Sequence, residues 1–272
     1  MTDRYAVVGN PVAHSLSPQI HTAFARQTGA DLVYTRLLAP LDRFAACIAE
    51  FRAEGGAGVN VTLPFKLEAW RLATRRSERA EQAQAVNTLR FDGGVVFGDN
   101  TDGAGLVRDI EINCAHAIAG RRVLLLGAGG AARGVLLPLI GCRPSALVIA
   151  NRSIDKALAL AQHFSRWGAC RACSYAELAA NTFDIVINAT SASVAGELPP
   201  LPAGVFAPGS LAYDMMYGAR ALPFLQSAQA QGAARGIDGL GMLVEQAAEA
   251  FFVWRGVRPQ TAPVIAALKE IR

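Results

Sequence analysis

The sequence lacks the features that mark secreted, membrane-spanning and nucleic-acid-binding chains. It contains no run of about eighteen apolar residues, so we expect neither a membrane span nor a signal peptide. Its five cysteines are odd in number and scattered, which argues against a disulfide framework. The formal net charge is only +4 and the cations form no runs, so we expect no nucleic-acid partner. These absences favour a cytoplasmic protein that binds anionic small molecules.

The chain does have enough apolar residues to build large cores. It is 52% hydrophobic over 272 residues, which is long enough for two domains. Apolar runs of strand length alternate with segments of helical periodicity, and this alternation predicts an α/β fold with mainly parallel sheets and helices on both faces. In such folds ligands bind at the carboxyl ends of the strands, so polar residues at those ends are candidate site residues.

The pattern also predicts the order of the elements. The segment 198–209 is rich in proline and is expected to be a surface loop. Asp92–Gly94 should form a hairpin turn of the primed kind, and Ser17 should cap a helix that begins at Pro18. Expected strands cover 5–9, 32–38, a run from 58, 86–91, 95–97, 123–126, 146–150, 184–188 and 211–217, and expected helices cover about 18–26, 41–51, 66–76, 104–113, 131–140, 154–167, 219–232 and 238–254.

A glycine-rich segment follows the apolar run 123–126. Gly127 permits a tight turn, Gly129 lets the backbone approach a pyrophosphate, and Ala132 lets the following helix pack closely on the strand. The amino terminus of that helix offers N–H groups and the positive end of a dipole to phosphates. The pattern indicates a dinucleotide-binding turn, and the alternative is a plain strand-to-helix turn.

The end of the next strand bears on the choice of cofactor. The run 146–150 is followed by Asn151, Arg152 and Ser153, and then by Lys156. An NAD site usually carries Asp or Glu here for the ribose 2′-hydroxyl, whereas an Arg suits the 2′-phosphate of NADP. The sequence therefore favours NADP, and the alternative is a solvated turn with two incidental cations.

Three groups of possible metal ligands lack the spacing of a metal site. The lone CxxC is better explained as a helix-to-strand connection, the two aspartates lack the ligand pattern of an EF-hand, and the two histidines are better explained as structural. We therefore expect no bound metal at these residues, which are Cys170 and Cys173, Asp99 and Asp102, and His14 and His21.

Taken together, nine blocks in this order resemble the NADP-dependent shikimate dehydrogenase family. The resemblance spans nearly the whole chain, and one departure is Ser153, where the family often has Thr. The blocks are Gly9–Pro18, Asn60–Lys66, Ala85–Thr88, Gly98–Gly103, Gly127–Ala131, Asn151–Ser153, Asn188–Ser191, Tyr213–Tyr217 and Asp238–Gln246.

The resemblance implies a substrate domain at 1–103, completed by 239–272, and an NADP domain at 104–238. It implies the reduction of 3-dehydroshikimate to shikimate on the pathway to aromatic amino acids. The implied substrate-binding residues are Ser15, Ser17, Thr62, Lys66, Asn87, Asp102, Tyr217 and Gln246. The implied cofactor-binding residues are Gly127, Ala128, Gly129, Gly130, Ala131, Asn151, Arg152, Ser153, Lys156, Thr190, Met215, Gly239 and Met242.

Reduction of a ketone by hydride places negative charge on oxygen, so the reaction requires a proton donor. Lys66 is the candidate, because a charged donor also stabilises the developing alkoxide. Asp102 would orient Lys66 and bind a neighbouring hydroxyl. For an isolated Lys or Asp a surface ion pair would be the default, but both residues are expected at strand ends.

Other functions remain possible at this point. A quinate/shikimate dehydrogenase with broader substrate or NAD use is the nearest alternative, although Arg152 argues against NAD. A methylene-tetrahydrofolate dehydrogenase would not need Ser15, Ser17 and Gln246 together. A catalytically silent NADP sensor would be expected to lose the Lys66 and Asp102 pair. We expect a monomer or homodimer.

Overall fold

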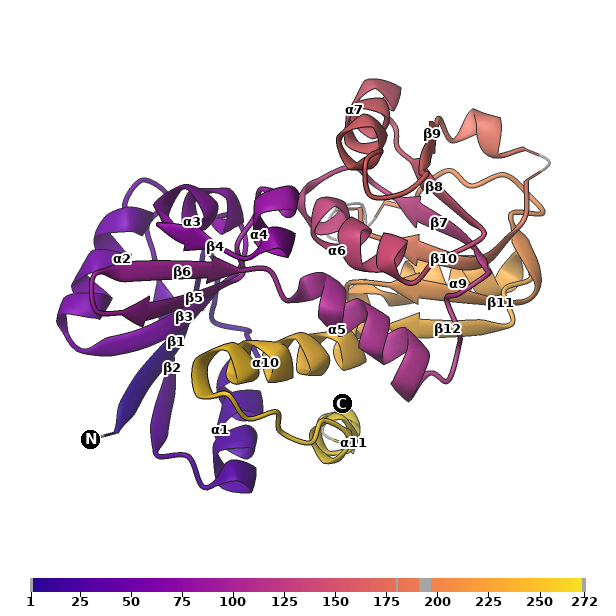
Figure 1. The fold of residues 1–272 in the computed structure, drawn as a ribbon. Coiled ribbons are helices and arrows are strands. Elements are labelled where there is room, and N and C mark those ends of the chain that lie inside the picture. Colours follow the sequence, from indigo (N-terminus) through magenta and orange to yellow (C-terminus); the bar gives the residue numbers. More distant parts are fainter. Residues whose placement is uncertain (1, 180, 191–196, 271–272) are drawn as a thin grey trace. The chain divides into compact units, whose positions relative to one another are not determined.

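The chain divides into two compact units, each with its own sheet (Figure 1). The computed structural model describes residues 2–179, 181–190 and 197–270. Unit 1 comprises Met1–Gly105 and Val244–Arg272, and unit 2 comprises Leu106–Leu243. Their limits differ by a few residues from the division at 103 and 239, because helices α5 (Asp102–Arg108) and α10 (Leu240–Arg255) continue through both boundaries.

Unit 1 contains a mixed six-stranded sheet in the order β2-β1-β3-β5-β6-β4. The pairs β1–β2, β1–β3 and β4–β6 are parallel, whereas β5 is antiparallel to both of its neighbours. The expected hairpin is present, and Gly93 in its turn has φ 54°. The strands are β1 (Asp3–Gly9), β2 (Leu32–Leu38), β3 (Gly56–Val61), β4 (Arg75–Arg76), β5 (Thr88–Asp92) and β6 (Val95–Asp99).

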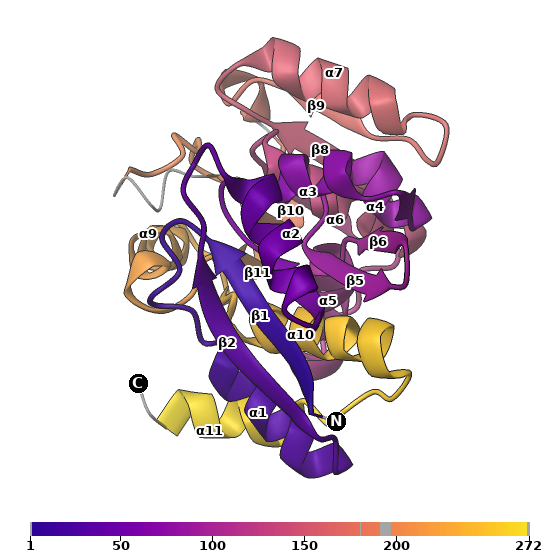
Figure 2. The same ribbon diagram turned by 90° about the vertical axis from the view of Figure 1, so that its left-hand side faces the viewer.

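Side chains of β1 alternate between two cores. Ala6 and Val8 pack with residues of α2 (Phe44–Ala53) and α3 (Lys66–Leu72), while Tyr5 and Val7 face the opposite side. On that side lie α1 (Ser17–Thr28) and α10, and Figure 2 shows α1 beside β1 and β2. The remaining helices of this unit are α4 (Glu78–Ala83) and α11 (Ala262–Glu270).

The indole of Trp254 on α10 closes the second core. It stacks on Tyr5 with ring centroids 4.5 Å apart and donates a 3.0 Å hydrogen bond to the carbonyl of Leu89. A Cβ at Gly58 would lie 2.7 Å from the indole nitrogen, so only glycine leaves room for this side chain. Helix α10 therefore packs directly on the amino-terminal sheet through Trp254.

Unit 2 contains a six-stranded parallel sheet in the order β12-β11-β10-β7-β8-β9. Numbered from β7, this is the strand order of a Rossmann fold. The predicted α/β class with mainly parallel sheets is therefore confirmed. The strands are β7 (Arg122–Leu126), β8 (Ala146–Ala150), β9 (Arg171–Cys173), β10 (Phe183–Asn188), β11 (Phe206–Asp214) and β12 (Arg235–Asp238).

Helices cover both faces of this sheet. Val123 and Leu125 pack against α6 (Gly130–Gly141) and α7 (Ile154–Phe164), whereas Leu124 and Leu126 belong to the core under α9 (Leu222–Ala230). The four apolar side chains of β7, Val123 to Leu126, are fully buried, which explains why this part of the strand is a continuous apolar run.

Several predicted boundaries are wrong for identifiable reasons. The helix expected over 66–76 ends at Leu72, because Ala73 is extended (ψ 125°), and β4 and α4 follow it. Ser17 is the first helical residue of α1 and not its N-cap, which is Leu16. The expected loop 198–209 already contains the start of β11.

Other elements are shorter, differ in type or were not predicted. The helix expected over 154–167 ends at Phe164, and that expected over 219–232 is a 3-10 turn, η3 (Gly218–Arg220), followed by α9. The last turn of the helix expected over 104–113 is a π-helix, η1 (Asp109–Asn113). The CxxC segment leads from α7 into β9 as expected, but β9, β12 and α11 were not predicted as elements.

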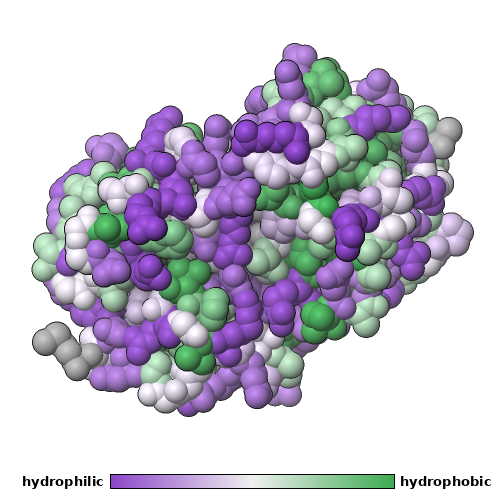
Figure 3. Space-filling view, viewed as in Figure 1, coloured by the Kyte–Doolittle hydropathy of each residue, from purple (hydrophilic) through white to green (hydrophobic). Residues whose placement is uncertain are grey.

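The surface mixes polar and apolar residues. On the face in Figure 3, hydrophobic residues are interspersed with hydrophilic ones. Among the described residues, no helix is sufficiently long and apolar to traverse a lipid bilayer.

Candidate active site

Lys66 and Asp102 form an ion pair inside unit 1. Lys66 begins α3 just after β3, and Asp102 begins α5 just after β6, so each lies near the end of a strand. The Lys66 ammonium contacts Oδ2 of Asp102, and the side chains are only 23% and 10% exposed. The other carboxylate oxygen accepts a 2.8 Å hydrogen bond from the Asn87 amide. Both oxygens of Asp102 are therefore engaged, which fixes the orientation of the ion pair.

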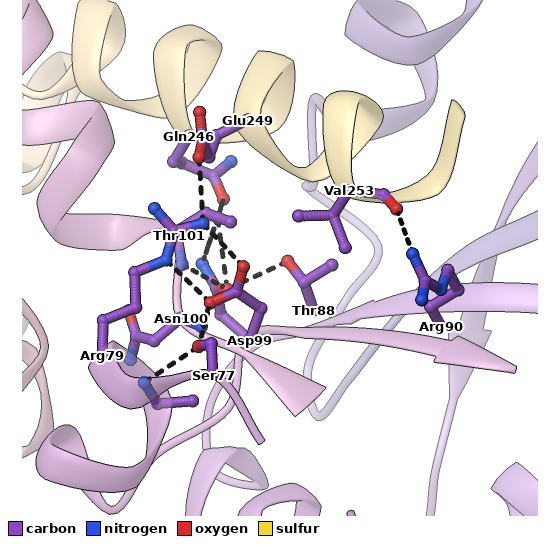
Figure 4. A network of polar contacts seen from close by, with 12 residues as sticks. Ser77, Arg79, Thr88, Arg90, Asp99, Asn100, Thr101, Gln246, Glu249 and Val253 are labelled. Atoms are coloured by element: carbon purple, nitrogen blue, oxygen red, sulfur yellow. Dashed lines mark hydrogen bonds and ion pairs between the residues drawn. The ribbon is translucent and has the colours of Figure 1, made fainter. Parts of the chain in front are cut away.

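The Asn87 side chain connects this pair to further polar groups. Its Oδ1 accepts hydrogen bonds from the backbone N–H of Thr101 at 2.9 Å and from the Thr88 hydroxyl at 3.0 Å. Because a backbone N–H can only donate, the amide orientation is determined. Its Nδ2 consequently points to Asp102 and also lies 3.3 Å from Oε1 of Gln246 on α10. Figure 4 shows Gln246 above Thr101, whose hydroxyl lies 3.4 Å from the same Oε1.

A chain of buried hydrogen bonds links Asn87 to the two serines. Asn60 on β3 donates to the Asn87 carbonyl at 3.3 Å and accepts from the Tyr34 hydroxyl at 2.7 Å. Tyr34 is also hydrogen-bonded to Ser17, and burial raises the pKa of its phenol well above the usual range. The hydroxyls of Ser15 and Ser17 lie 3.1 Å apart. The residues expected to bind carboxylate and hydroxyl groups are therefore held in one polar network.

His21 packs against this network from α1. Its ring stacks on Tyr34 with centroids 4.3 Å apart, and Nε2 lies 3.1 Å from Oδ1 of Asn60. Complete burial lowers the pKa of His21 to about 3, so the ring is neutral at neutral pH. The interpretation of His21 as a structural, hydrogen-bonding histidine agrees with these contacts.

Sequence reasoning did not single out three residues of the network: Tyr34, Thr88 and Thr101. Thr101 lies within the block Gly98–Gly103, so the block pointed to it without identifying a role. Tyr34 stands in an apolar strand and gives no local signal, because its partner Asn60 is 26 residues away.

Thr62 and Tyr217 are the remaining expected substrate-binding residues. Thr62 follows β3, and its backbone N–H donates to the carbonyl of Val8 at 2.9 Å. A Cβ at Gly9 would lie 2.4 Å from Cγ2 of Thr62, so glycine is required beside it. Tyr217 belongs to unit 2, where it precedes η3.

In unit 2 the expected cofactor residues gather at the carboxyl edge of the sheet. Gly127 ends β7 with φ 105°, and a Cβ there would lie 3.1 Å from the Ala189 carbonyl oxygen, so only glycine fits the turn without strain. Gly129 is the N-cap of α6, and a Cβ on Gly129 or Gly130 would meet no atom within 4 Å. The backbone is therefore open beside the helix terminus formed with Ala128 and Ala131.

The ends of the neighbouring strands complete this edge. Asn151 follows β8 and donates to the Ser153 carbonyl at 2.9 Å, and Arg152 between them is exposed. Thr190 follows β10 and is hydrogen-bonded to Asn188 at 2.7 Å. Lys156 lies in the first turns of α7, Met215 follows β11, Gly239 follows β12 and Met242 is buried on α10. Ser191, part of one sequence block, lies outside the described residues.

Three family models match the chain. They are the shikimate dehydrogenase substrate binding domain over residues 7–89, shikimate/quinate 5-dehydrogenase over 111–195 and the shikimate 5′-dehydrogenase C-terminal domain over 239–269. A shikimate dehydrogenase (NADP(+)) of Dechloromonas aromatica is 64% identical and covers 99% of this chain and 98% of its own.

Solved structures match over the same extent. The Ael1 enzyme from Pseudomonas putida has 53% identity and a TM-score of 0.93, with 98% of each chain covered. Shikimate 5-dehydrogenase from Thermus thermophilus, solved with NADP(H) and shikimate, has 33% identity and a TM-score of 0.86, with 99% of each chain covered. Matching family models across both units and a relative of this identity lead to one conclusion: the chain belongs to the shikimate dehydrogenase family.

Proposed function

We propose that this protein catalyses the NADPH-dependent, reversible reduction of 3-dehydroshikimate to shikimate on the pathway to chorismate and the aromatic amino acids. Family membership sets the reaction class, and relatives named NADP-dependent shikimate dehydrogenases support the choice of cofactor. The single observation that carries the mechanism is the shielded ion pair between Lys66 and Asp102.

Lys66 is the proposed proton donor in the direction of reduction. When bound, NADPH supplies a hydride to the carbonyl carbon, and the carbonyl π electrons move to oxygen. The Lys66 ammonium donates a proton to that oxygen, which yields the alcohol and a neutral amine. In the direction of oxidation Lys66 accepts the proton. General acid help of this kind is worth about 10²–10⁴ in rate.

Asp102 and Asn87 have positioning roles in this proposal. Asp102 holds the ammonium through one oxygen while the Asn87 amide holds the other, so Lys66 is aimed before substrate arrives. Asn87, Asp102 and Gln246 would bind ring hydroxyls. The hydroxyls of Ser15 and Ser17 would bind the substrate carboxylate, with Thr62 and Tyr217 as further contacts.

The carboxyl edge of unit 2 suits NADP by its backbone shape and its charge. The positive φ of Gly127 and the open backbone at Gly129 allow a pyrophosphate to approach the terminus of α6. Arg152 is exposed and makes no ion pair within the described part of the chain, so its guanidinium is available to a 2′-phosphate. We also propose that the protein is located in the cytoplasm and that it is a monomer or homodimer.

A single assay tests the function. Nicotinamide absorbance is followed with shikimate or quinate as substrate and NADP⁺ or NAD⁺ as cofactor. The expected result is efficient turnover only for shikimate with NADP⁺. Comparable turnover of quinate, or equal use of NAD⁺, would support the broader quinate/shikimate activity that one matching family model includes. No turnover of either substrate would refute the proposed dehydrogenase activity.

A further inference from the structure

Arg79 on α4 joins two carboxylates that are far apart in the sequence of unit 1 (Figure 4). Its Nε and Nη2 donate to the two oxygens of Asp99 at 2.7 and 2.6 Å, and Nη2 also donates to Oε1 of Glu249 at 2.9 Å. The exposed fractions of these side chains are 24%, 5% and 13%. A forked contact with a buried carboxylate is much stronger and more directional than a surface ion pair.

Asp99 begins the segment that carries the proposed site residues. It ends β6, accepts from the Ser77 hydroxyl and accepts from the backbone N–H of Asn100 at 2.7 Å. Asn100 in turn accepts from the backbone N–H of Asp102 at 3.1 Å. One end of the Arg79 contact is therefore anchored to the segment that presents Asp102.

Glu249 lies on α10 three residues after Gln246, and residues with this spacing are neighbours on one face of a helix. Gln246 meets Asn87 and Thr101 at 3.3 and 3.4 Å, which is the long end of the hydrogen-bond range. Glu249 is bound more firmly, because it pairs with Arg79 and also with Arg258. The second end of the Arg79 contact is thus anchored close to Gln246.

We propose that Arg79 is a positioning residue for substrate binding: it holds α10 against the Asp99–Asp102 segment, so that Gln246 is aligned with Asn87 and Asp102. The inference rests on the proposed function, since it concerns how the same site binds its substrate. Arg79 acts through Gln246 and has no contact with the reacting atoms in this scheme.

A double-mutant cycle tests the proposal. Arg79→Met should raise KM for shikimate about tenfold, the equivalent of losing one well-formed hydrogen bond, with a smaller fall in kcat. KM for NADP⁺ should stay within about twofold, since Asp99 and Glu249, the two partners of Arg79 described above, both belong to unit 1. In a Gln246→Ala background, Arg79→Met should raise KM no further. Arg79→Lys, which keeps the charge without the fork, should give an intermediate KM.

A second variant keeps the test decisive if Arg79→Met does not fold. Glu249→Gln leaves the Arg79–Asp99 contact in place and weakens the ion pairs of Glu249 with Arg79 and Arg258, so it should reproduce the rise in shikimate KM. Arg76→Met is the matched control: Arg76 pairs with Glu81 at 3.4 Å and its guanidinium stacks over Trp70, so both KM values should stay unchanged.

Three outcomes would overturn the proposal. They are an undiminished effect of Arg79→Met in the Gln246→Ala background, an equal rise in both KM values, or a normal shikimate KM in Glu249→Gln. Failure of the proposed function is a separate result, because it would appear as wild-type protein that does not oxidise shikimate at all.

Discussion

The polar groups of the two expected binding regions differ in how they are held: by other side chains in unit 1, and by backbone shape in unit 2. In unit 1 the Lys66 cluster is built from side chains that already bind one another, with Asp102 held from both oxygens. In unit 2 the corresponding edge is built from backbone shape at Gly127 and from exposed cations such as Arg152. Side chains that are already fixed by hydrogen bonds and ion pairs suit a reaction in which a proton donor must be oriented before the substrate binds. Open backbone N–H groups at a helix terminus suit a ligand that carries negatively charged phosphates.

This contrast makes distinct predictions for the two regions. Changes in the unit 1 cluster should act mainly on the chemical step or on substrate binding. Changes at the unit 2 edge should act mainly on cofactor binding and on the discrimination between cofactors. A unit 1 variant that alters cofactor discrimination, or a unit 2 variant that alters only the chemical step, would contradict this division of roles.

The largest effect is expected for Lys66→Ala. Loss of the group that accepts the proton in oxidation and donates it in reduction should lower kcat by about 10²–10⁴ with a smaller change in KM. Steady-state kinetics with shikimate and NADP⁺ measure this directly. Lys269→Ala on α11 is the control and should have wild-type kinetics. A Lys66→Ala enzyme with unchanged kcat would remove Lys66 from the mechanism.

Arg152→Ala should act on cofactor binding at the unit 2 edge. Loss of the guanidinium should weaken NADPH binding by about 1.5–3 kcal/mol and leave NADH nearly unaffected, since only NADPH carries the 2′-phosphate. Fluorescence titration with each cofactor measures this. Arg166→Ala removes another arginine of unit 2, one that lies over the Trp167 ring, and should change neither affinity. Equal loss for both cofactors would indicate a general disturbance of the unit.

Gly127→Ala tests the role of backbone shape. At φ 105°, with a carbonyl oxygen 3.1 Å from the new Cβ, alanine should cost about 1–2 kcal/mol of stability in unit 2. Calorimetry should show a lower Tm, and KM for NADP⁺ should rise. Gly141→Ala, at the end of α6 with no atom within 4 Å of the Cβ, should be neutral or stabilising. An unaltered Tm for Gly127→Ala would show that the turn tolerates a side chain.

A pH dependence of stability is expected in unit 1. The pKa of His21 is about 3 in the folded protein and 6.5 in an exposed imidazole, so the unfolded chain binds an extra proton between these values. The free energy of unfolding should therefore fall as pH falls below 6.5, by about 1.4 kcal/mol per pH unit from this residue.

Denaturant unfolding between pH 6.5 and about 5 measures this slope. His21→Gln should reduce the slope, and His14→Gln, at an exposed histidine, is the control. An identical slope in His21→Gln would mean that His21 is not buried in neutral form.

The regular parts of both units could be predicted from the sequence, because buried strands leave long apolar runs. β2 and β8 have the predicted limits, and the turn at Gly127 follows the strand as expected. Lys66 and Asp102 could be identified from the family resemblance and from their expected position at strand ends.

The elements and contacts that could not be predicted leave no local pattern in the sequence. β4 is two charged residues, Arg75–Arg76, whose strand character comes only from pairing with β6. The contact between Arg79 and Glu249 joins residues 170 positions apart, so neither residue alone signals it. The helix expected over 66–76 was too long, because the residues of this segment favour a helix. The chain is extended from Ala73 onward, since Arg75–Arg76 must pair with β6.

The packing of Trp254 on Gly58 has a consequence for synthesis of the protein. Residues 1–105 are translated well before the helix that carries this indole, because residues 106–239 are made in between. Until then α1 covers this face of the amino-terminal sheet without α10, so the closure of the face depends on a helix that is translated after unit 2.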